Sequence, residues 1–137
     1  MRRMEDTKTF TVSEARAALP NLRALLVELQ SERSALISLH PHINLARARA
    51  EQNGGSPFGE RYLDHAFAFA MLLDEIEQTG VIIKDFNAGL VDFPHEHEGR
   101  IVYLCWKLGE DDLSWWHEID DGFAGRQPIG EAFERSN

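Results

Sequence analysis

The spacing of the apolar residues changes once along this chain, at Gly80, and this change limits the folds that the chain can adopt. Before Gly80, leucines and aromatic residues recur every three or four positions, which is the period of an amphipathic helix. After Gly80, β-branched and aromatic residues alternate with polar ones, which is the period of a strand. Helices that are followed by strands, rather than alternating with them, indicate an α+β fold.

The first helix begins with a capping box, in which the Thr11 hydroxyl caps the first turn and the Glu14 carboxylate reaches back to the Thr11 amide. Leucines at helical spacing continue from there. Pro20 and Pro41 interrupt this pattern, and each predicts a kink or a break, because proline lacks an amide hydrogen and clashes with the preceding turn.

A second long helix is expected from about residue 58 to residue 79, after a glycine-containing loop at 52–57. Its apolar residues are separated by four and three positions in turn, as in the seam between two packed helices. We therefore expect residues 12–79 to form an antiparallel helical hairpin, which serves either as a scaffold or as a coiled coil for a partner. The residues of the seam are Tyr62, Ala66, Phe69, Leu73 and Ile76.

Three short strands are expected within residues 81–108, at 81–85, 90–94 and 101–108. The connections between them are short, which favours an antiparallel meander. Alternation directs one set of side chains toward the helices as an apolar face. This set consists of Val81, Ile83, Val91, Phe93, Val102, Leu104, Trp106 and Leu108.

The C-terminal part is expected to contain one short helix, at residues 111–121, which is capped by an aspartate and ended by Gly122. Residues 122–137 are then a loop and tail. A chain of this length, residues 1–137, is expected to form a single domain. That domain is a helical hairpin packed on a small three-stranded antiparallel sheet, with the short C-terminal helix added.

The opposite face of the expected sheet is semi-polar and carries the residues best suited to chemistry. Pairing across the turns places Lys84 opposite Asp92, and Asp92 near Tyr103. With Glu110 at the end of a strand and His117 in the following helix, these five side chains form one candidate polar cluster.

Asp92, Glu110 and His117 are the candidate ligands for a divalent metal ion, because carboxylates and imidazole both bind such ions. Their spacing in the sequence matches no recognised metal-ligand motif. In the alternative interpretation, Asp92 pairs with Lys84, Glu110 is exposed, and His117 is bonded to a backbone carbonyl.

Arg100 and Arg126 are the candidates for binding an anion, since a guanidinium group recognises carboxylate or phosphate through two hydrogen bonds. The loop at 122–128 adds glycine amides, but it lacks the strand–glycine–helix context of a nucleotide-binding loop. In the alternative interpretation, Arg126 forms a structural salt bridge with Asp92 or Glu110.

Two other features that attract attention are interpreted as structural. The segment His95–Glu98 precedes Gly99 and is interpreted as a solvated, charged turn rather than a metal-binding pair of histidines. Cys105 lies in the middle of a strand and is interpreted as a small buried apolar residue, because reactive cysteines need exposure and a lowered pKa.

The net charge of −9 argues against binding to nucleic acid, which requires clustered lysine and arginine. No segment approaches the ~20 consecutive apolar residues of a membrane helix, and the N-terminus does not resemble a secretion signal. The single cysteine cannot form an internal disulfide. These features predict a cytoplasmic protein that binds no membrane.

The chain contains a series of short motifs, which are Phe10-Thr11, Glu14-Ala15, Leu19-Pro20, Lys84-Asp85, Gly89–Pro94, Gly99-Arg100, Leu104–Trp106, Gly109-Glu110, Trp116-His117 and Gly122–Pro128. This series resembles the bacterial family catalogued as domain of unknown function 2203. The resemblance covers most of the chain and is most specific in its second half. That family has no established activity, so the resemblance implies no catalytic residue.

On these grounds we expect a protein that is not an enzyme and that acts by association, as a homo-oligomer formed through the helical hairpin. The expectation rests on the long apolar seam and on the lack of a recognisable catalytic set. The alternative is a protein that binds a divalent metal or a small anion, or a hydrolase, with its site around Asp92, Glu110 and His117. The sequence identifies no small-molecule ligand.

Overall fold

The computed structural model describes residues 7–53 and 57–135, with side chains described for residues 7–41 and 59–134. The chain divides into two compact units. The first unit joins the residues up to Leu26 with those from Ile76 onward, and it contains a β-sheet. The described residues of the second unit, Val27–Glu75, are helical. The α+β class expected from the sequence is confirmed.

Helix α1, Val12–Asn53, begins where the sequence predicts. The Glu14 amide donates to the Thr11 hydroxyl at 3.0 Å, and the Thr11 amide donates to the Glu14 carboxylate at 2.9 Å, which completes the capping box. Pro20 and Pro41 both lie inside this helix, so neither of them breaks it. Each proline removes one amide donor, and the remaining hydrogen bonds of so long a helix outweigh that loss.

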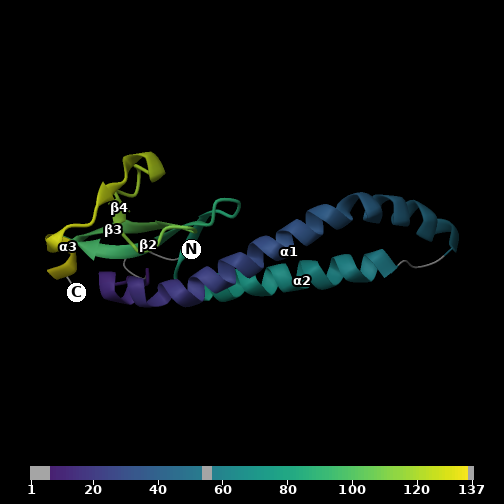
Figure 1. Ribbon diagram of the computed structural model, residues 1–137, viewed down its shortest axis with the longest axis horizontal. Coiled ribbons are helices and arrows are strands. Elements are labelled where there is room, and N and C mark those ends of the chain that lie inside the picture. The colour runs from purple at the N-terminus through teal and green to yellow at the C-terminus, as the bar shows by residue number, and fades with distance from the viewer. Residues whose placement is uncertain (1–6, 54–56, 136–137) are drawn as a thin grey trace. The chain divides into compact units, whose positions relative to one another are not determined.

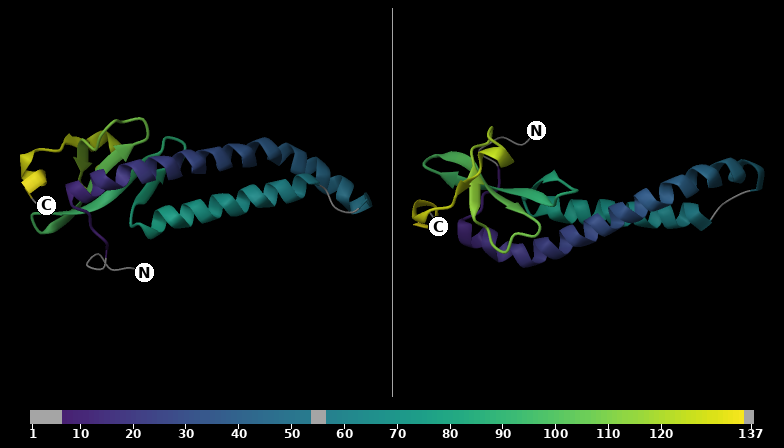
Figure 2. Two further views of the ribbon diagram at one scale, coloured as in Figure 1. Left: turned by 60° about the horizontal axis from the view of Figure 1, so that its bottom comes forward. Right: turned by 45° about the horizontal axis from the view of Figure 1, so that its top comes forward.

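The second unit consists of the C-terminal part of α1 and most of helix α2, Pro57–Gln78. The two helices contact each other through His65 and Glu32, whose Nδ1 and Oε2 atoms lie 2.5 Å apart. The two ribbons run side by side over much of this unit (Figures 1 and 2). An antiparallel hairpin over the whole of residues 12–79 is not established by these contacts and stays a prediction.

The first unit contains one antiparallel sheet of five strands, in the order β1-β2-β3-β4-β5. Each strand pairs with its neighbour in the sequence, as in the expected meander. The expected number of three strands is wrong, because two further strands follow the three that the alternation predicts. The strands are β1 (Ile82–Asp85), β2 (Leu90–His97), β3 (Arg100–Lys107), β4 (Trp115–His117) and β5 (Gln127–Pro128).

The short helix expected at residues 111–121 is also wrong. Strand β4 lies in this segment and pairs with β3, so that its aromatic residues extend the sheet instead of covering it. Residues 122–137 were expected to be a loop and tail, but their described part contains three short elements. These are the 3₁₀ helix η2 (Phe123–Gly125), strand β5 and helix α3 (Glu131–Arg135).

The turn between β2 and β3 consists of only two residues, Glu98 and Gly99. Their φ angles are 51° and 78°, and positive values at both positions are typical of the tight turn that matches the twist of a hairpin. Strand β2 therefore extends as far as His97, three residues beyond the strand that the sequence predicts.

The apolar face of the sheet packs against the N-terminal part of α1 in the first unit. Val91 lies opposite Trp106 and Phe93 lies opposite Leu104, and all four side chains are fully buried. The ring of Phe10 meets that of Phe93 edge to face, with centroids 5.2 Å apart. The apolar face predicted from alternation is confirmed at these positions. From α1, the core receives Val12, Ala15, Leu19, Leu22, Leu25 and Leu26.

Gly89, before β2, occupies a position where any side chain is expected to destabilise the fold. Its φ is +67°, and a Cβ atom there would lie 2.5 Å from the Cβ of Leu108. We expect Gly89→Ala to lower the free energy of unfolding by about 2 kcal/mol, through the left-handed backbone and the steric overlap together. Urea unfolding measures this loss.

Gly99→Ala is the matched control for that substitution. The φ of Gly99 is +78°, but a Cβ atom there meets no atom of the described residues within 4 Å. Its loss should therefore be about 1 kcal/mol, from the backbone alone. Equal losses at Gly89 and Gly99 would contradict a steric contribution from Leu108.

Candidate functional site

Three polar side chains meet on the second face of the sheet, one from each of three adjacent strands. Asp92 of β2 lies opposite Cys105 of β3, and His117 of β4 lies opposite Tyr103, two residues before Cys105. Alternate residues of a strand share a face, so Asp92, Cys105 and His117 project from the same side of the sheet. Their exposed fractions are 1%, 1% and 2%. The meander therefore brings these three side chains into one buried cluster.

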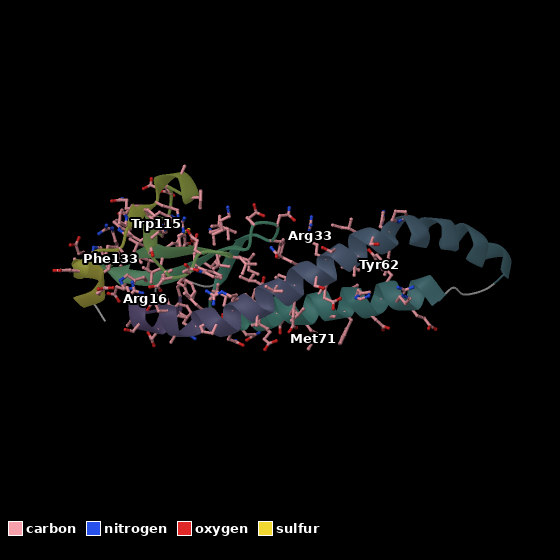
Figure 3. All side chains as sticks on the ribbon, viewed as in Figure 1. Arg16, Arg33, Tyr62, Met71, Trp115 and Phe133 are labelled. Atoms are coloured by element: carbon pink, nitrogen blue, oxygen red, sulfur yellow. The ribbon has the colours of Figure 1, made fainter. Side chains whose placement is uncertain are left out.

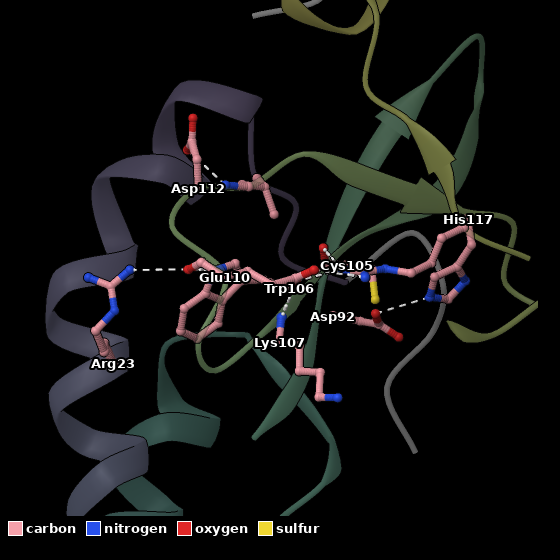
Figure 4. A network of polar contacts seen from close by, with 10 residues as sticks. Arg23, Asp92, Cys105, Trp106, Lys107, Glu110, Asp112 and His117 are labelled. Carbon is pink, nitrogen blue, oxygen red and sulfur yellow. Dashed lines mark hydrogen bonds and ion pairs between the residues drawn. The ribbon is translucent and has the colours of Figure 1, made fainter. Parts of the chain in front are cut away.

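The two ring nitrogens of His117 each contact an oxygen atom, and Figure 4 shows the contact with Asp92. Its Nδ1 lies 2.7 Å from the carbonyl oxygen of Glu118, which can only accept, so Nδ1 carries a hydrogen. Its Nε2 lies 3.0 Å from Oδ1 of Asp92. Through this contact the His117 ring connects β4 to β2 across the intervening strand β3.

Lys84 and Tyr103, two members of the predicted polar cluster, lie beside these three side chains. The Nζ atom of Lys84 lies 4.0 Å from Oδ2 of Asp92 and 4.9 Å from the centre of the Tyr103 ring. The Tyr103 ring in turn meets the His117 ring edge-on, with centroids 5.6 Å apart. Burial, and then the charge of Asp92, raise the pKa of Tyr103. The expected pairing of Lys84 directly opposite Asp92 is wrong, because Ile82 is the backbone partner of Asp92, and Lys84 reaches the carboxylate diagonally.

Cys105 is the member of the cluster that the sequence does not single out. Burial, and then the negative charge of Asp92, raise the pKa of its thiol to about 12, so the thiol is protonated at neutral pH. The expectation that Cys105 is buried is confirmed, but its neighbours are polar groups rather than an apolar core. Strand alternation predicts Cys105 on the face of Tyr103, and the structure places it there, beside Asp92 and His117.

Glu110 is held by Arg126 and does not join the cluster. The Nη1 and Nη2 atoms of Arg126 donate to the two carboxylate oxygens of Glu110 at 2.9 and 2.7 Å. The Lys107 amide also donates to this carboxylate, at 2.7 Å. The structure thus brings together Asp92 and His117 of the predicted metal set, but not Glu110. The salt bridge from Arg126, which was the alternative, is formed with Glu110.

Both arginines that were expected to bind an anion are engaged by carboxylates of the chain itself. Besides its contact with Glu110, Arg126 donates to the Cys105 carbonyl at 3.1 Å. Arg100 donates to Glu118 through Nε at 3.0 Å and through Nη2 at 2.6 Å. The two guanidinium groups therefore do not converge on one anion site.

The two histidines of β2 belong to the core, so the interpretation of His95–Glu98 as a solvated turn is wrong. His95 is 2% exposed and His97 is 8% exposed. The His97 ring stacks on Phe133 of α3, with centroids 3.9 Å apart and an angle of 10°. The Nδ1 atom of His95 lies 2.7 Å from the carbonyl oxygen of Phe10. The tight turn lengthens β2, and alternation then points both rings to the face that also carries Phe93.

The model of one protein family matches residues 8–129 of this chain, and its description is "Uncharacterized conserved protein (DUF2203)". The match confirms the resemblance drawn from the short motifs. No curated protein and no solved structure matches the chain. Among the residues that the structure describes, no helix has both the length and the apolar character needed to cross a membrane.

Proposed function

We propose that this chain, which belongs to the DUF2203 family of uncharacterized conserved proteins, acts by association with a second copy of itself. The family description names no activity, so the proposal rests on residues of this chain. The surface that we assign to the association is one side of helix α2 in the second unit.

An exposed apolar stripe runs along α2 and supports this assignment. The stripe consists of Leu63, Phe67 and Met71, which follow each other by four residues and so lie on one side of the helix. Their exposed fractions are 68%, 68% and 55%. Met71 lies on the side of α2 that faces away from α1 (Figure 3). Large apolar side chains gathered on a surface are typical of a site that a partner covers.

The order of residues in the stripe suits the pairing of two identical helices. Phe67 lies at its centre, with Leu63 four residues before it and Met71 four residues after it. When two copies pack in opposite directions about a two-fold axis at Phe67, Leu63 of each copy meets Met71 of the other. Such a contact needs only one kind of surface, which is why a second copy is the occupant that we propose.

Phe67→Glu is expected to weaken this association strongly, because it places a charge at the centre of the contact in both copies. Loss of a central aromatic residue from an interface costs about 2 kcal/mol or more, so the dissociation constant should rise at least ~30-fold. Sedimentation equilibrium over a series of concentrations measures the constant. Added salt should strengthen the wild-type association, since each copy carries a net charge of −9.

Ile119→Glu is the matched control, because it adds the same charge at an apolar residue of the first unit that is 37% exposed. This control should keep the wild-type dissociation constant. Circular dichroism confirms that both variants keep their helices. A wild-type chain that is monomeric at every concentration would contradict the proposal, and so would a Phe67→Glu variant that dimerises like the wild type.

A further inference from the structure

The buried cluster on the second face of the sheet combines three kinds of metal ligand. Asp92 offers a carboxylate oxygen, Cys105 a sulfur and His117 an imidazole nitrogen. These ligand atoms all lie within 4.8 Å of one another, and each residue is at most 2% exposed. Among the residues described by the structure, this is the one group of three or more such side chains that are close enough to share an ion.

The orientation of His117 is the one that a metal-binding histidine adopts. Its Nδ1–H donates to the Glu118 carbonyl at 2.7 Å, which fixes the ring and turns Nε2 toward Asp92. Nε2 of His117 and Oδ1 of Asp92 lie 3.0 Å apart. A cation can bind between these two atoms, and the sulfur of Cys105 is then close enough to become a third ligand.

The charge of the cluster also balances that of a divalent cation. An ionised Asp92 and a thiolate at Cys105 supply two negative charges, while His117 binds as the neutral imidazole. The occupied site is therefore neutral, which matters because a buried net charge is costly. On binding, a sulfur–metal bond replaces the S–H bond, and the thiol proton passes to solvent together with any proton carried by Nε2 of His117 or by Asp92.

Lys84 is the partly exposed charged residue beside the cluster. Its side chain is 42% exposed, and its ammonium group is 4.0 Å from the second oxygen of Asp92. The ammonium group supplies a positive charge beside the Asp92 carboxylate. It can turn outward to water when a metal ion takes over that role.

We propose that Asp92, Cys105 and His117 bind one zinc-like divalent ion, with a fourth coordination position left for water or a small ligand. Bonds of about 2.0 Å to nitrogen and oxygen and 2.3 Å to sulfur place tetrahedral ligand atoms roughly 3.2–3.6 Å apart. Nε2 of His117 and Oδ1 of Asp92 are already 3.0 Å apart, and the separations within the cluster, at most 4.8 Å, have to shorten by no more than roughly 1–1.5 Å. The sulfur ligand disfavours magnesium and calcium, which take oxygen ligands. This site is separate from the association through α2.

The experiment is a titration of the full chain, stripped of metal with a chelator, by Co²⁺ and then by Zn²⁺. One equivalent of Co²⁺ should produce a sulfur-to-cobalt charge-transfer absorption, and Zn²⁺ should displace it. Because Cys105 is the single cysteine, that absorption can come from no other residue of the chain. Competition with a chromophoric chelator should give a zinc dissociation constant below about 1 µM.

Three variants test the ligands one at a time. Cys105→Ser should abolish the sulfur-to-cobalt absorption, and Cys105→Ser, Asp92→Asn and His117→Gln should each weaken zinc binding at least about 100-fold. His97→Gln is the control, because His97 is a histidine of β2 on the opposite face of the sheet, and it should keep the wild-type affinity.

The proposal is overturned if the stripped wild-type chain gives no sulfur-to-cobalt absorption and binds zinc no more tightly than the His117→Gln variant. It is also overturned if Cys105→Ser binds zinc as the wild type does. If a variant fails to fold, the titration of the wild-type chain alone shows whether the cluster binds zinc through Cys105. Association through α2 is measured separately, so either result leaves the dimer to be judged by sedimentation.

Discussion

Trp106→Ala is expected to lower the free energy of unfolding by about 3–5 kcal/mol, a large part of the stability of a domain of this size. Trp106 is fully buried opposite Val91 in the neighbouring strand. The guanidinium group of Arg23 lies 5.5 Å from the centre of its ring, and its Nε1 donates to the Glu110 carbonyl at 3.1 Å. Alanine removes these contacts and leaves a cavity that the surrounding strands and helix cannot close.

Urea unfolding followed by the fluorescence of Trp115 and Trp116 measures this loss, and the midpoint should fall by about 2 M. Trp106→Phe is the control, since it keeps an aromatic ring but loses the hydrogen bond of Nε1. It should cost about 1–2 kcal/mol. A Trp106→Ala variant that is no less stable than Trp106→Phe would contradict the account of the cavity.

Glu110→Ala is expected to destabilise the fold by about 2–3 kcal/mol at neutral pH, because it leaves Arg126 buried without its carboxylate. The Arg126 side chain is 11% exposed, and that of Glu110 is 26% exposed. Partial access of water to Glu110 places the effect below the full cost of breaking a buried ion pair. The Nε atom of Arg126 has no hydrogen-bond partner among the described residues, so its guanidinium group depends on Glu110 and on the Cys105 carbonyl.

The ion pair of Glu110 and Arg126 is expected to make the folded chain less stable at acidic pH than at neutral pH. Burial alone would raise the pKa of Glu110, but hydrogen bonds from Arg126 and from the Lys107 amide outweigh it and hold the pKa below the usual 4.5. Such a group binds protons more readily in the unfolded chain. Its stabilising contribution is therefore complete above about pH 4.5 and is lost as the pH falls through the lower, folded value.

Two measurements check the account of this pair. The difference in unfolding free energy between the wild type and Glu110→Gln should be constant from about pH 7 to about pH 5 and should shrink below about pH 4.5. In a double-mutant cycle with Arg126→Met, the double variant should lose about 1.5–2 kcal/mol less unfolding free energy than the sum of the losses of the two single variants. A difference that does not change with pH, or losses that simply add, would show that the pair contributes little.

Local signals predicted the parts of the fold that depend on neighbours in the sequence. The capping box at Thr11 fixed the start of α1, and the change of period at Gly80 separated helices from strands. Strand β4 cannot be predicted in this way, because its three residues, Trp115–His117, are too few for alternation to distinguish a strand from a helical turn. The burial of His97 was missed because it depends on Phe133, which lies far along the chain.

For the candidate site, alternation along a strand predicts which residues share a face of the sheet, but not which residues of other segments lie beside them. That rule placed Asp92 and Tyr103 on the same face, but it could not decide which residue of the next segment lies beside them. The register of β4, with His117 opposite Tyr103, decides that His117 rather than Glu110 completes the cluster. Residue type alone predicts an inert, buried Cys105, whereas its contact with Asp92 and His117 follows from the pairing of three strands.

Both edges of the sheet are poor templates for amyloid growth. Strand β5 has two residues, of which Pro128 lacks an amide hydrogen, and β1 has four residues with a register shift between Ile83 and Asp85. Lys84 adds a charge to the β1 edge. A foreign strand that approaches either edge finds few consecutive donors and acceptors, so stacking of sheets into a fibre is hard to start.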